Sequence, residues 1–248
     1  MNNIHAPSFL ENAAENGIVI FVHGFMGSPR QFDDFAAAVY ESGRSTASIL
    51  LSGHGGSVKD FTDSTFSDWQ EHVNREVGRF SKIYSGIWLV GHSMGGLLSL
   101  ISSVKYCETV CGVVAIASPF EIKYFSAKST KVRVKLALSK KSNPVKTAYL
   151  DSDSVPQSFG LWFGLKKPVS ELKKLMRAAR EILPLVRAPV LAVYSASDET
   201  VELDNIEIFE SELSSAKLEV ITVSDSLHAY YTESERELIK RAILSFLG

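Results

Sequence analysis

The stretch Val90-Gly91-His92-Ser93-Met94-Gly95-Gly96-Leu97 places a small hydroxyl residue between glycines, directly after the apolar run at 87–90. The apolar run predicts a buried strand, and residues 93–106 that follow it predict a helix. Glycines beside Ser93 let the strand and helix backbones approach where side chains would collide. The stretch is therefore a tight strand-to-helix corner, and the rest of the chain must decide whether the corner serves to expose the serine.

Around this corner, short apolar runs alternate with longer amphipathic segments. This alternation is typical of an α/β fold with a mostly parallel sheet that is covered by helices on both faces. Strands are predicted at 18–23, 46–51, 87–90, 112–117, 190–194 and 218–223. Helices are predicted at 29–41, 66–83, 93–106, 202–212 and 233–246. Ser28 and Pro29 suit the cap and the first turn of the first helix.

The alternation breaks at about 119–187, where no segment clearly continues the sheet. Segment 131–138 alternates charged and apolar residues and favours a strand or extended arm, whereas 169–186 has the spacing of an amphipathic helix that ends near Pro184. The first half of this insertion is rich in lysine, which is interpreted as a solvated face or as a docking surface for an anionic substrate or membrane. We expect one domain over 1–248, with the insertion forming a cap.

Composition and charge exclude several classes of protein. The 248 residues are 45% apolar and 22% charged, which is ordinary for a globular protein, and a net charge of −2 gives no basic field for nucleic acid. No apolar stretch approaches the roughly 18 residues of a membrane span, and no leader pattern opens the chain, so a cytoplasmic protein is expected. Cys107 and Cys111 cannot complete a zinc site by themselves and are predicted to be reduced, buried or half-buried thiols.

Gly91-x-Ser93-x-Gly95 between a strand and a helix predicts a nucleophile elbow. A serine hydroxyl attacks only when a histidine takes its proton and a carboxylate orients that histidine. Among six histidines, only His228 lies between the last predicted strand and the last predicted helix. The preferred carboxylate is Asp198, which follows the strand at 190–194. Three other carboxylates remain as rivals: Glu199, Asp204 and Asp225.

Acyl transfer also needs two fixed donors for the oxyanion that develops. The N–H of Met94, the residue after the elbow serine, is predicted to supply one. The loop after the first strand, His23-Gly24-Phe25-Met26-Gly27, is predicted to supply the other. The N–H of Phe25 is the first choice, with Met26 as the alternative.

Four segments, HGFMG (23–27), GHSMG (91–95), SASDETV (195–201) and SLHAYY (226–231), resemble the α/β-hydrolase superfamily in order and position. Together with LSGHG (51–55) and the end of the cap, they resemble small bacterial carboxylesterases and their monoacylglycerol-lipase relatives. The resemblance implies a sheet of six or seven strands, with a cap after the sixth strand of the family. The chain departs from larger members at its start: about seventeen residues precede the first predicted strand, so their antiparallel hairpin is expected to be missing or reduced to one edge strand near 8–11.

The same resemblance implies a triad of Ser93, Asp198 and His228 that hydrolyses carboxylic esters through an acyl-enzyme. It implies no cofactor and no metal, and a small ester with an apolar acyl chain as the substrate. Monoacylglycerol lipase and acyl thioesterase are the alternatives that share this triad, and a non-hydrolytic ligand-binding protein on the same scaffold is a further one. Oligomeric state is left open by the sequence.

Other residues near these segments have two interpretations. His23 and His92 are predicted to be structural, the first fixing the oxyanion loop and the second supporting the elbow. His54 lies in a glycine-rich loop without the ending of a nucleotide-binding loop, so a packed or rim histidine is expected. The residues suggested for the substrate pocket are Phe120, Trp162 and Phe163, and Trp69 is either pocket or core.

Overall fold

The computed structural model describes residues 5–13, 17–122, 144–156, 161 and 164–248. Its described strands form one sheet in the order β1-β3-β2-β4-β5-β6-β7, in which only β1 is antiparallel to its neighbour. The strands are β1 (Ser8–Leu10), β2 (Ile18–Val22), β3 (Ser45–Ile49), β4 (Ile87–His92), β5 (Val110–Ile116), β6 (Val190–Ser195) and β7 (Leu218–Val223). The α/β class and all six predicted strands are confirmed, and β1 is the expected edge strand.

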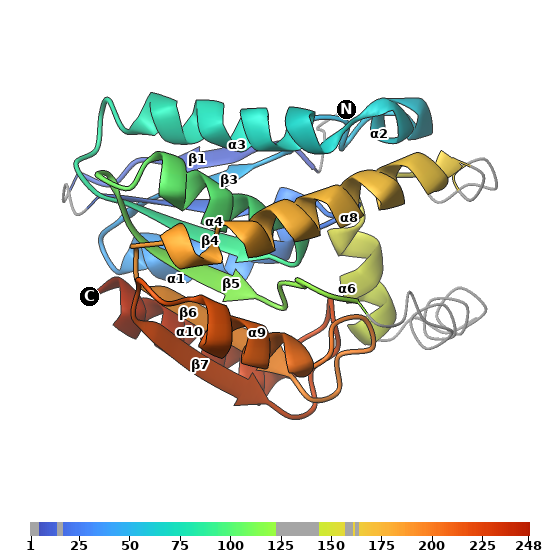
Figure 1. Ribbon diagram of the computed structural model, residues 1–248. Coiled ribbons are helices and arrows are strands. Elements are labelled where there is room, and N and C mark those ends of the chain that lie inside the picture. The colour runs from blue at the N-terminus through green and yellow to red at the C-terminus, as the bar shows by residue number, and fades with distance from the viewer. Residues whose placement is uncertain (1–4, 14–16, 123–143, 157–160, 162–163) are drawn as a thin grey trace.

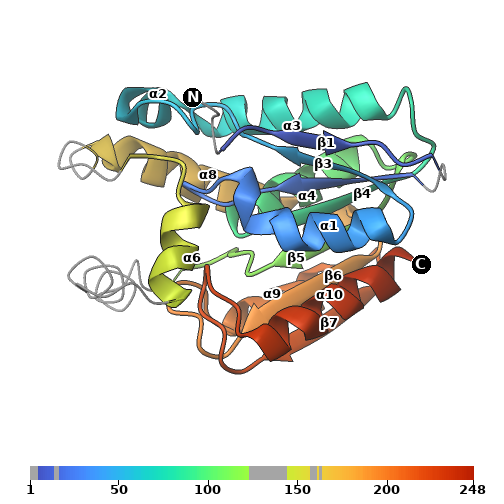
Figure 2. The same ribbon diagram turned by 180° about the vertical axis from the view of Figure 1, so that it is seen from behind.

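Helices cover both faces of this sheet (Figures 1 and 2). The described helices are η1 (Pro29–Phe32), α1 (Asp33–Glu41), α2 (Val58–Asp63), α3 (Phe66–Phe80), α4 (Met94–Lys105), α6 (Pro144–Ser152), α8 (Lys166–Glu181), η2 (Leu183–Leu185), α9 (Asp204–Glu212) and α10 (Glu233–Leu247). Helices α3, α4, α8 and α9 lie on one face, and α1 and α10 lie on the other. The predicted first helix is split, because its Pro29 turn is 3-10 and the α-helix begins at Asp33.

The central strands β2, β4, β5 and β6 are mostly apolar because both faces of the sheet are buried there. All five residues of β2 are buried, and they alternate between two cores. Ile18 and Ile20 pack with α3, α4 and α8 on one side, whereas Val19 and Phe21 pack with α1 and α10 on the other. This alternation follows from the two-residue period of a strand and fixes the strand register.

The insertion follows β5, the fifth strand of this chain, because a single edge strand stands where the family's opening hairpin would add two. Helix α8 with η2 confirms the predicted amphipathic helix, and its apolar side packs on α4. Helix α6 was not predicted and lies across the carboxyl edge of the sheet (Figures 1 and 2). The arm predicted at 131–138 lies outside the described residues.

One prediction about side chains is wrong. Cys107 and Cys111 are free thiols, as expected, but both are exposed. Cys107 follows the end of α4 at Lys105, and Cys111 is the one exposed residue of β5, near the start of that strand.

None of the helices in the described ranges is long and apolar enough to span a bilayer.

Parallel pairing brings the carboxyl ends of the central strands to one edge of the sheet. In register, Val22 pairs with Gly91, His92 with Ile116, and Ser195 with Val223. The loops that follow β2, β4, β6 and β7 therefore leave the sheet on the same side. These loops and the first residue of α4 carry every residue that the sequence predicted for catalysis, so this edge is the candidate active site.

Candidate active site

The elbow is specified by steric contacts of its backbone. Ser93 has φ 52° and ψ −119°, a left-handed conformation that is costly for a residue with a side chain. Its N–H donates to the carbonyl of Ile116 at 2.7 Å, which ties the turn to the neighbouring strand. A Cβ on Gly95 would lie 1.9 Å from the carbonyl oxygen of Val22, and one on Gly91 would lie 2.4 Å from Gly95. Only glycine at both positions allows this turn.

The predicted base and acid are hydrogen-bonded. His228 Nδ1 lies 2.8 Å from Asp198 Oδ2, and both side chains are buried. Because a carboxylate accepts, His228 carries its proton on Nδ1, and the unprotonated Nε2 can act as an acceptor. The His228 ring packs on the ring of His92, the residue before Ser93, and the two ring centroids are 4.7 Å apart.

Asp198 is held in its charged form. Burial alone would raise the pKa of Asp198, but the charge and hydrogen bond of His228, together with the N–H groups of Val201 and Thr200, outweigh it, and the net pKa lies below the ordinary value. Its other oxygen, Oδ1, accepts from the N–H groups of Thr200 and Val201 at 2.7 and 2.9 Å. The carboxylate is thus fixed in both charge and direction. Of its rivals, Asp225 is exposed and Asp204 begins α9.

The segment that presents His228 is anchored by side chains from three elements. The carbonyl of His228 accepts from His92 Nε2 at 2.8 Å, so His92 ties the elbow to this loop rather than supporting the elbow alone. Ser195 Oγ donates to the carbonyl of Ser226 at 2.5 Å. Glu235, in α10, accepts from the N–H groups of residues 224 and 225 and from the hydroxyl of Ser226.

The loop after β2 approaches the elbow closely. A Cβ on Gly24 would lie 3.2 Å from Cβ of Ser93, so the residue before Phe25 lies beside the serine. The turn is closed by the N–H of Gly27, which donates to the carbonyl of Gly24 at 2.9 Å, and Met26 has φ 61°. Met94 begins α4, where the first N–H groups have no partner within the helix.

His23 and His54 are packed side chains, as predicted. His23 accepts from the N–H of Leu51 at 3.0 Å and bonds the carbonyl of Gly24 at 2.9 Å, which fixes the start of the oxyanion loop. Burial lowers the pKa of His54 to about 4, so its ring is neutral, and it packs edge-on against Phe61. Trp69 is fully buried and is a core residue.

The predicted pocket residues are only partly described. Phe120 is buried, its ring packs edge-on against Phe209 in the core, and its N–H donates to Asn205, so a contact with substrate stays a prediction. Trp162 and Phe163 lie outside the described residues.

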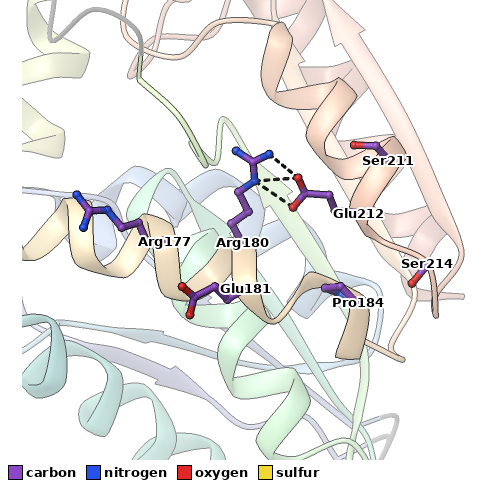
Figure 3. Close-up of a pocket in the computed structure, with 7 residues that line it drawn as sticks. All are labelled: Arg177, Arg180, Glu181, Pro184, Ser211, Glu212 and Ser214. Carbon is purple, nitrogen blue, oxygen red and sulfur yellow. Dashed lines mark hydrogen bonds and ion pairs between the residues drawn. The ribbon is translucent and has the colours of Figure 1, made fainter.

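A separate groove of about 540 Å³ lies between α8 and α9, and none of the residues that line it was predicted for the site (Figure 3). Its arginine Arg180 is held by Glu212 through paired hydrogen bonds.

The sequence missed one connection at this site. Glu199, weighed as a rival acid, accepts instead from the backbone N–H of His228 at 3.1 Å and from the hydroxyl of Tyr149 in α6. All three side chains are buried. Glu199 could be noticed from its position beside Asp198, but no pattern in the sequence pointed to Tyr149.

The fold and the strand-to-helix corner define the class of protein. The chain matches the family described as Serine aminopeptidase, S33 over residues 13–158, more than half of its length. It belongs to that family, and it is an α/β-hydrolase.

Individual relatives support this assignment. The thermostable monoacylglycerol lipase of Bacillus sp. (strain H-257) is 27% identical over 243 residues, which are 95% of this chain and 92% of that protein. Among solved structures, that of the metagenome-derived lipolytic enzymes LipS and LipT has a TM-score of 0.78 at 21% identity and covers 98% of this chain and 97% of its own. The monoacylglycerol lipase of Paleococcus ferrophilus has a TM-score of 0.73 at 16% identity, with 97% of each chain covered. These two structures share the fold.

Proposed function

We propose that this chain is a carboxylesterase that works through an acyl-enzyme, with Ser93, Asp198 and His228 as its triad. The observation that carries the proposal is the 2.8 Å contact between His228 Nδ1 and Asp198 Oδ2, beside an elbow that holds Ser93 at positive φ. The contact fixes the tautomer in which Nε2 can accept the serine proton.

In the proposed reaction, Ser93 Oγ attacks the ester carbonyl while His228 Nε2 takes its proton, and Asp198 stabilises the imidazolium. The N–H groups of Phe25 and Met94 receive the oxyanion. Collapse expels the alcohol, which regains a proton from His228, and leaves Ser93 acylated. A water, deprotonated by His228, then releases the carboxylic acid and restores the serine.

An apolar acyl chain suits the surroundings of the oxyanion loop. Met26 is buried in an apolar cluster with Phe61 and with Val155 and Leu161 of the insertion, and Phe25 packs against it. The Bacillus relative acts on monoacylglycerol according to its name and aligns over nearly the whole chain, which favours monoacylglycerol hydrolysis as the second candidate.

The test is a panel of aryl esters graded in acyl length, run with wild type and Ser93→Ala. Wild type should hydrolyse at least part of the series and be labelled by a fluorophosphonate, and Ser93→Ala should lose both. Undiminished hydrolysis by Ser93→Ala would show that the proposal is wrong.

Further substrates separate the candidates. A long-chain 1-monoacylglycerol preferred over short esters selects the lipase, and an acyl thioester preferred over both selects the thioesterase. An aminoacyl anilide tests the peptidase chemistry in the family's description. Tight ligand retention without turnover would instead indicate a binding protein.

A further inference from the structure

Helix α6 belongs to the insertion, yet it is hydrogen-bonded to the loop that carries His228. The hydroxyl of Tyr149 donates to Glu199 Oε1, and Glu199 Oε2 accepts from the N–H of His228 at 3.1 Å. Glu199 therefore connects the hydroxyl of Tyr149 in α6 to the peptide N–H of the proposed base.

This connection is buried and well satisfied. Tyr149 is 6% exposed and Glu199 is 4% exposed. Burial, followed by the nearby Glu199 carboxylate, raises the pKa of Tyr149, so the phenol keeps its proton and acts as a donor. Both oxygens of Glu199 accept, which leaves Glu199 unsuited to replace Asp198 on the imidazole.

The same segment of the insertion also holds the oxyanion loop. Five residues after Tyr149, Ser154 donates its N–H to the carbonyl of Met26 at 2.9 Å and its hydroxyl to the carbonyl of Gly27 at 2.5 Å. Residues 149–154 thus contact the loops that carry the proposed base and an oxyanion donor. A segment that only held the insertion in place would have no need to contact both loops.

We propose that Tyr149 and Glu199 are positioning residues that couple the insertion to the catalytic histidine. The inference rests on the proposed function for its catalytic meaning, but the connection itself can be measured without a substrate. Removing one partner of such a hydrogen bond destabilises the loop because the other partner is left buried and unpaired.

The experiment compares Tyr149→Phe and Glu199→Gln with wild type by amide hydrogen exchange and by steady-state kinetics. Tyr149→Phe removes one hydroxyl and keeps the ring, so the helix stays packed. Ser152→Ala is the matched control, because its buried hydroxyl donates to the carbonyl of Tyr149 at 3.0 Å, entirely within α6.

In both variants, the peptide containing 226–231 should exchange faster than in wild type, and in Ser152→Ala it should not. The kcat should fall about 10-fold with KM nearly unchanged, the change expected from one lost hydrogen bond. Because both residues act through one connection, the double variant should lose less than the product of the single losses.

Wild-type exchange at 226–231 in both variants would overturn the coupling, whatever happens to activity. Faster exchange with unchanged kcat, or a loss of thermal stability alone, would overturn the positioning role and leave a purely structural one. If wild type itself shows no Ser93-dependent hydrolysis, the proposed function fails, and the exchange result still decides whether the connection holds the loop.

Discussion

The elbow at 91–95 and the histidine loop at 224–231 present the two proposed reacting groups, but they are built differently. The elbow is fixed by its own backbone, since glycines at 91 and 95 leave no space for any Cβ. The histidine loop is fixed by side chains from elsewhere, among them His92, Glu199 and Glu235. Local sterics thus hold the proposed nucleophile, whereas hydrogen bonds from side chains of other elements hold the proposed base.

The largest effect is expected from Asp198→Asn. An amide would present a donor to His228 Nδ1 and favour the tautomer that cannot accept from Ser93, so turnover should fall on the order of 10⁴-fold. Ester hydrolysis measures the loss. Asp225→Asn, which changes an exposed carboxylate of the histidine loop, is the control and should retain activity. A larger loss in Asp225→Asn would show that the acid is assigned to the wrong residue.

The variant Gly95→Ala tests the elbow by adding a side chain where the surrounding backbone leaves no space. The new Cβ would lie 1.9 Å from the carbonyl of Val22, and relieving this clash should cost roughly 3 kcal/mol of unfolding free energy. Urea denaturation measures it. Gly78→Ala is the matched control, because its Cβ would lie 2.8 Å from the hydroxyl at the end of the Tyr106 side chain rather than against backbone, and alanine favours a helix. Equal midpoints for Gly95→Ala and wild type would show that the elbow tolerates displacement.

The sequence predicted the parts of the site that depend on local pattern. Ser93, Asp198 and His228 each follow a strand, and parallel strands end at one edge, so their order along the chain was enough to bring them together. The structure adds the hydrogen bond that selects Asp198 over Glu199. That choice depends on side-chain direction within one turn, which residue spacing does not specify.

The anchors of the histidine loop could not be predicted in the same way. Glu235 lies on the first turn of α10, where an acidic residue is explained by the helix dipole alone. Tyr149 lies in a helix with no clear apolar stripe, within an insertion whose first half suggested an extended arm. Tyr149 lies 50 residues from Glu199 along the chain, and Glu235 lies 9 to 11 residues from the groups that donate to it, so no local sequence pattern specifies either contact.

Acid should destabilise the contacts of the histidine loop but not those of the elbow, because the histidine loop depends on a neutral side chain. Burial, with the adjacent His228, lowers the pKa of His92 from 6.5 to about 3. On acidification, His92 therefore takes up a proton at a higher pH in the unfolded chain than in the folded chain. This difference lowers the free energy of unfolding as the pH drops below 6.5, by roughly 2 kcal/mol at about pH 5. Urea denaturation across this range measures the slope.

The variant His92→Gln tests the source of that slope. Glutamine does not titrate and can still donate to the carbonyl of His228, so its stability should change less between neutral and acidic pH. The elbow variant Gly95→Ala should keep the wild-type slope, because a steric clash has no dependence on protons. An equally steep slope in His92→Gln would show that another group causes the acid sensitivity.

The smallest effect is expected from Glu235→Gln, which removes one of the side chains that hold the histidine loop. Burial alone would raise the pKa of Glu235, but the hydroxyl of Ser226 and the N–H groups of residues 224–226 outweigh it and hold the pKa below 4.5. The carboxylate therefore stabilises the fold above that pH, and its contribution is lost as the pH falls through the lowered value.

The variant should be about 1 kcal/mol less stable than wild type at neutral pH, since an amide oxygen accepts fewer of these hydrogen bonds. This difference should shrink in acid, where the protonated glutamate resembles glutamine, and urea midpoints at both pH values measure it. Glu237→Gln, which loses an exposed pair with Lys240 on the same helix, is the control and should change little. A difference that persisted in acid would mean that glutamine is tolerated poorly for its shape, and that the histidine loop, like the elbow, is held by packing.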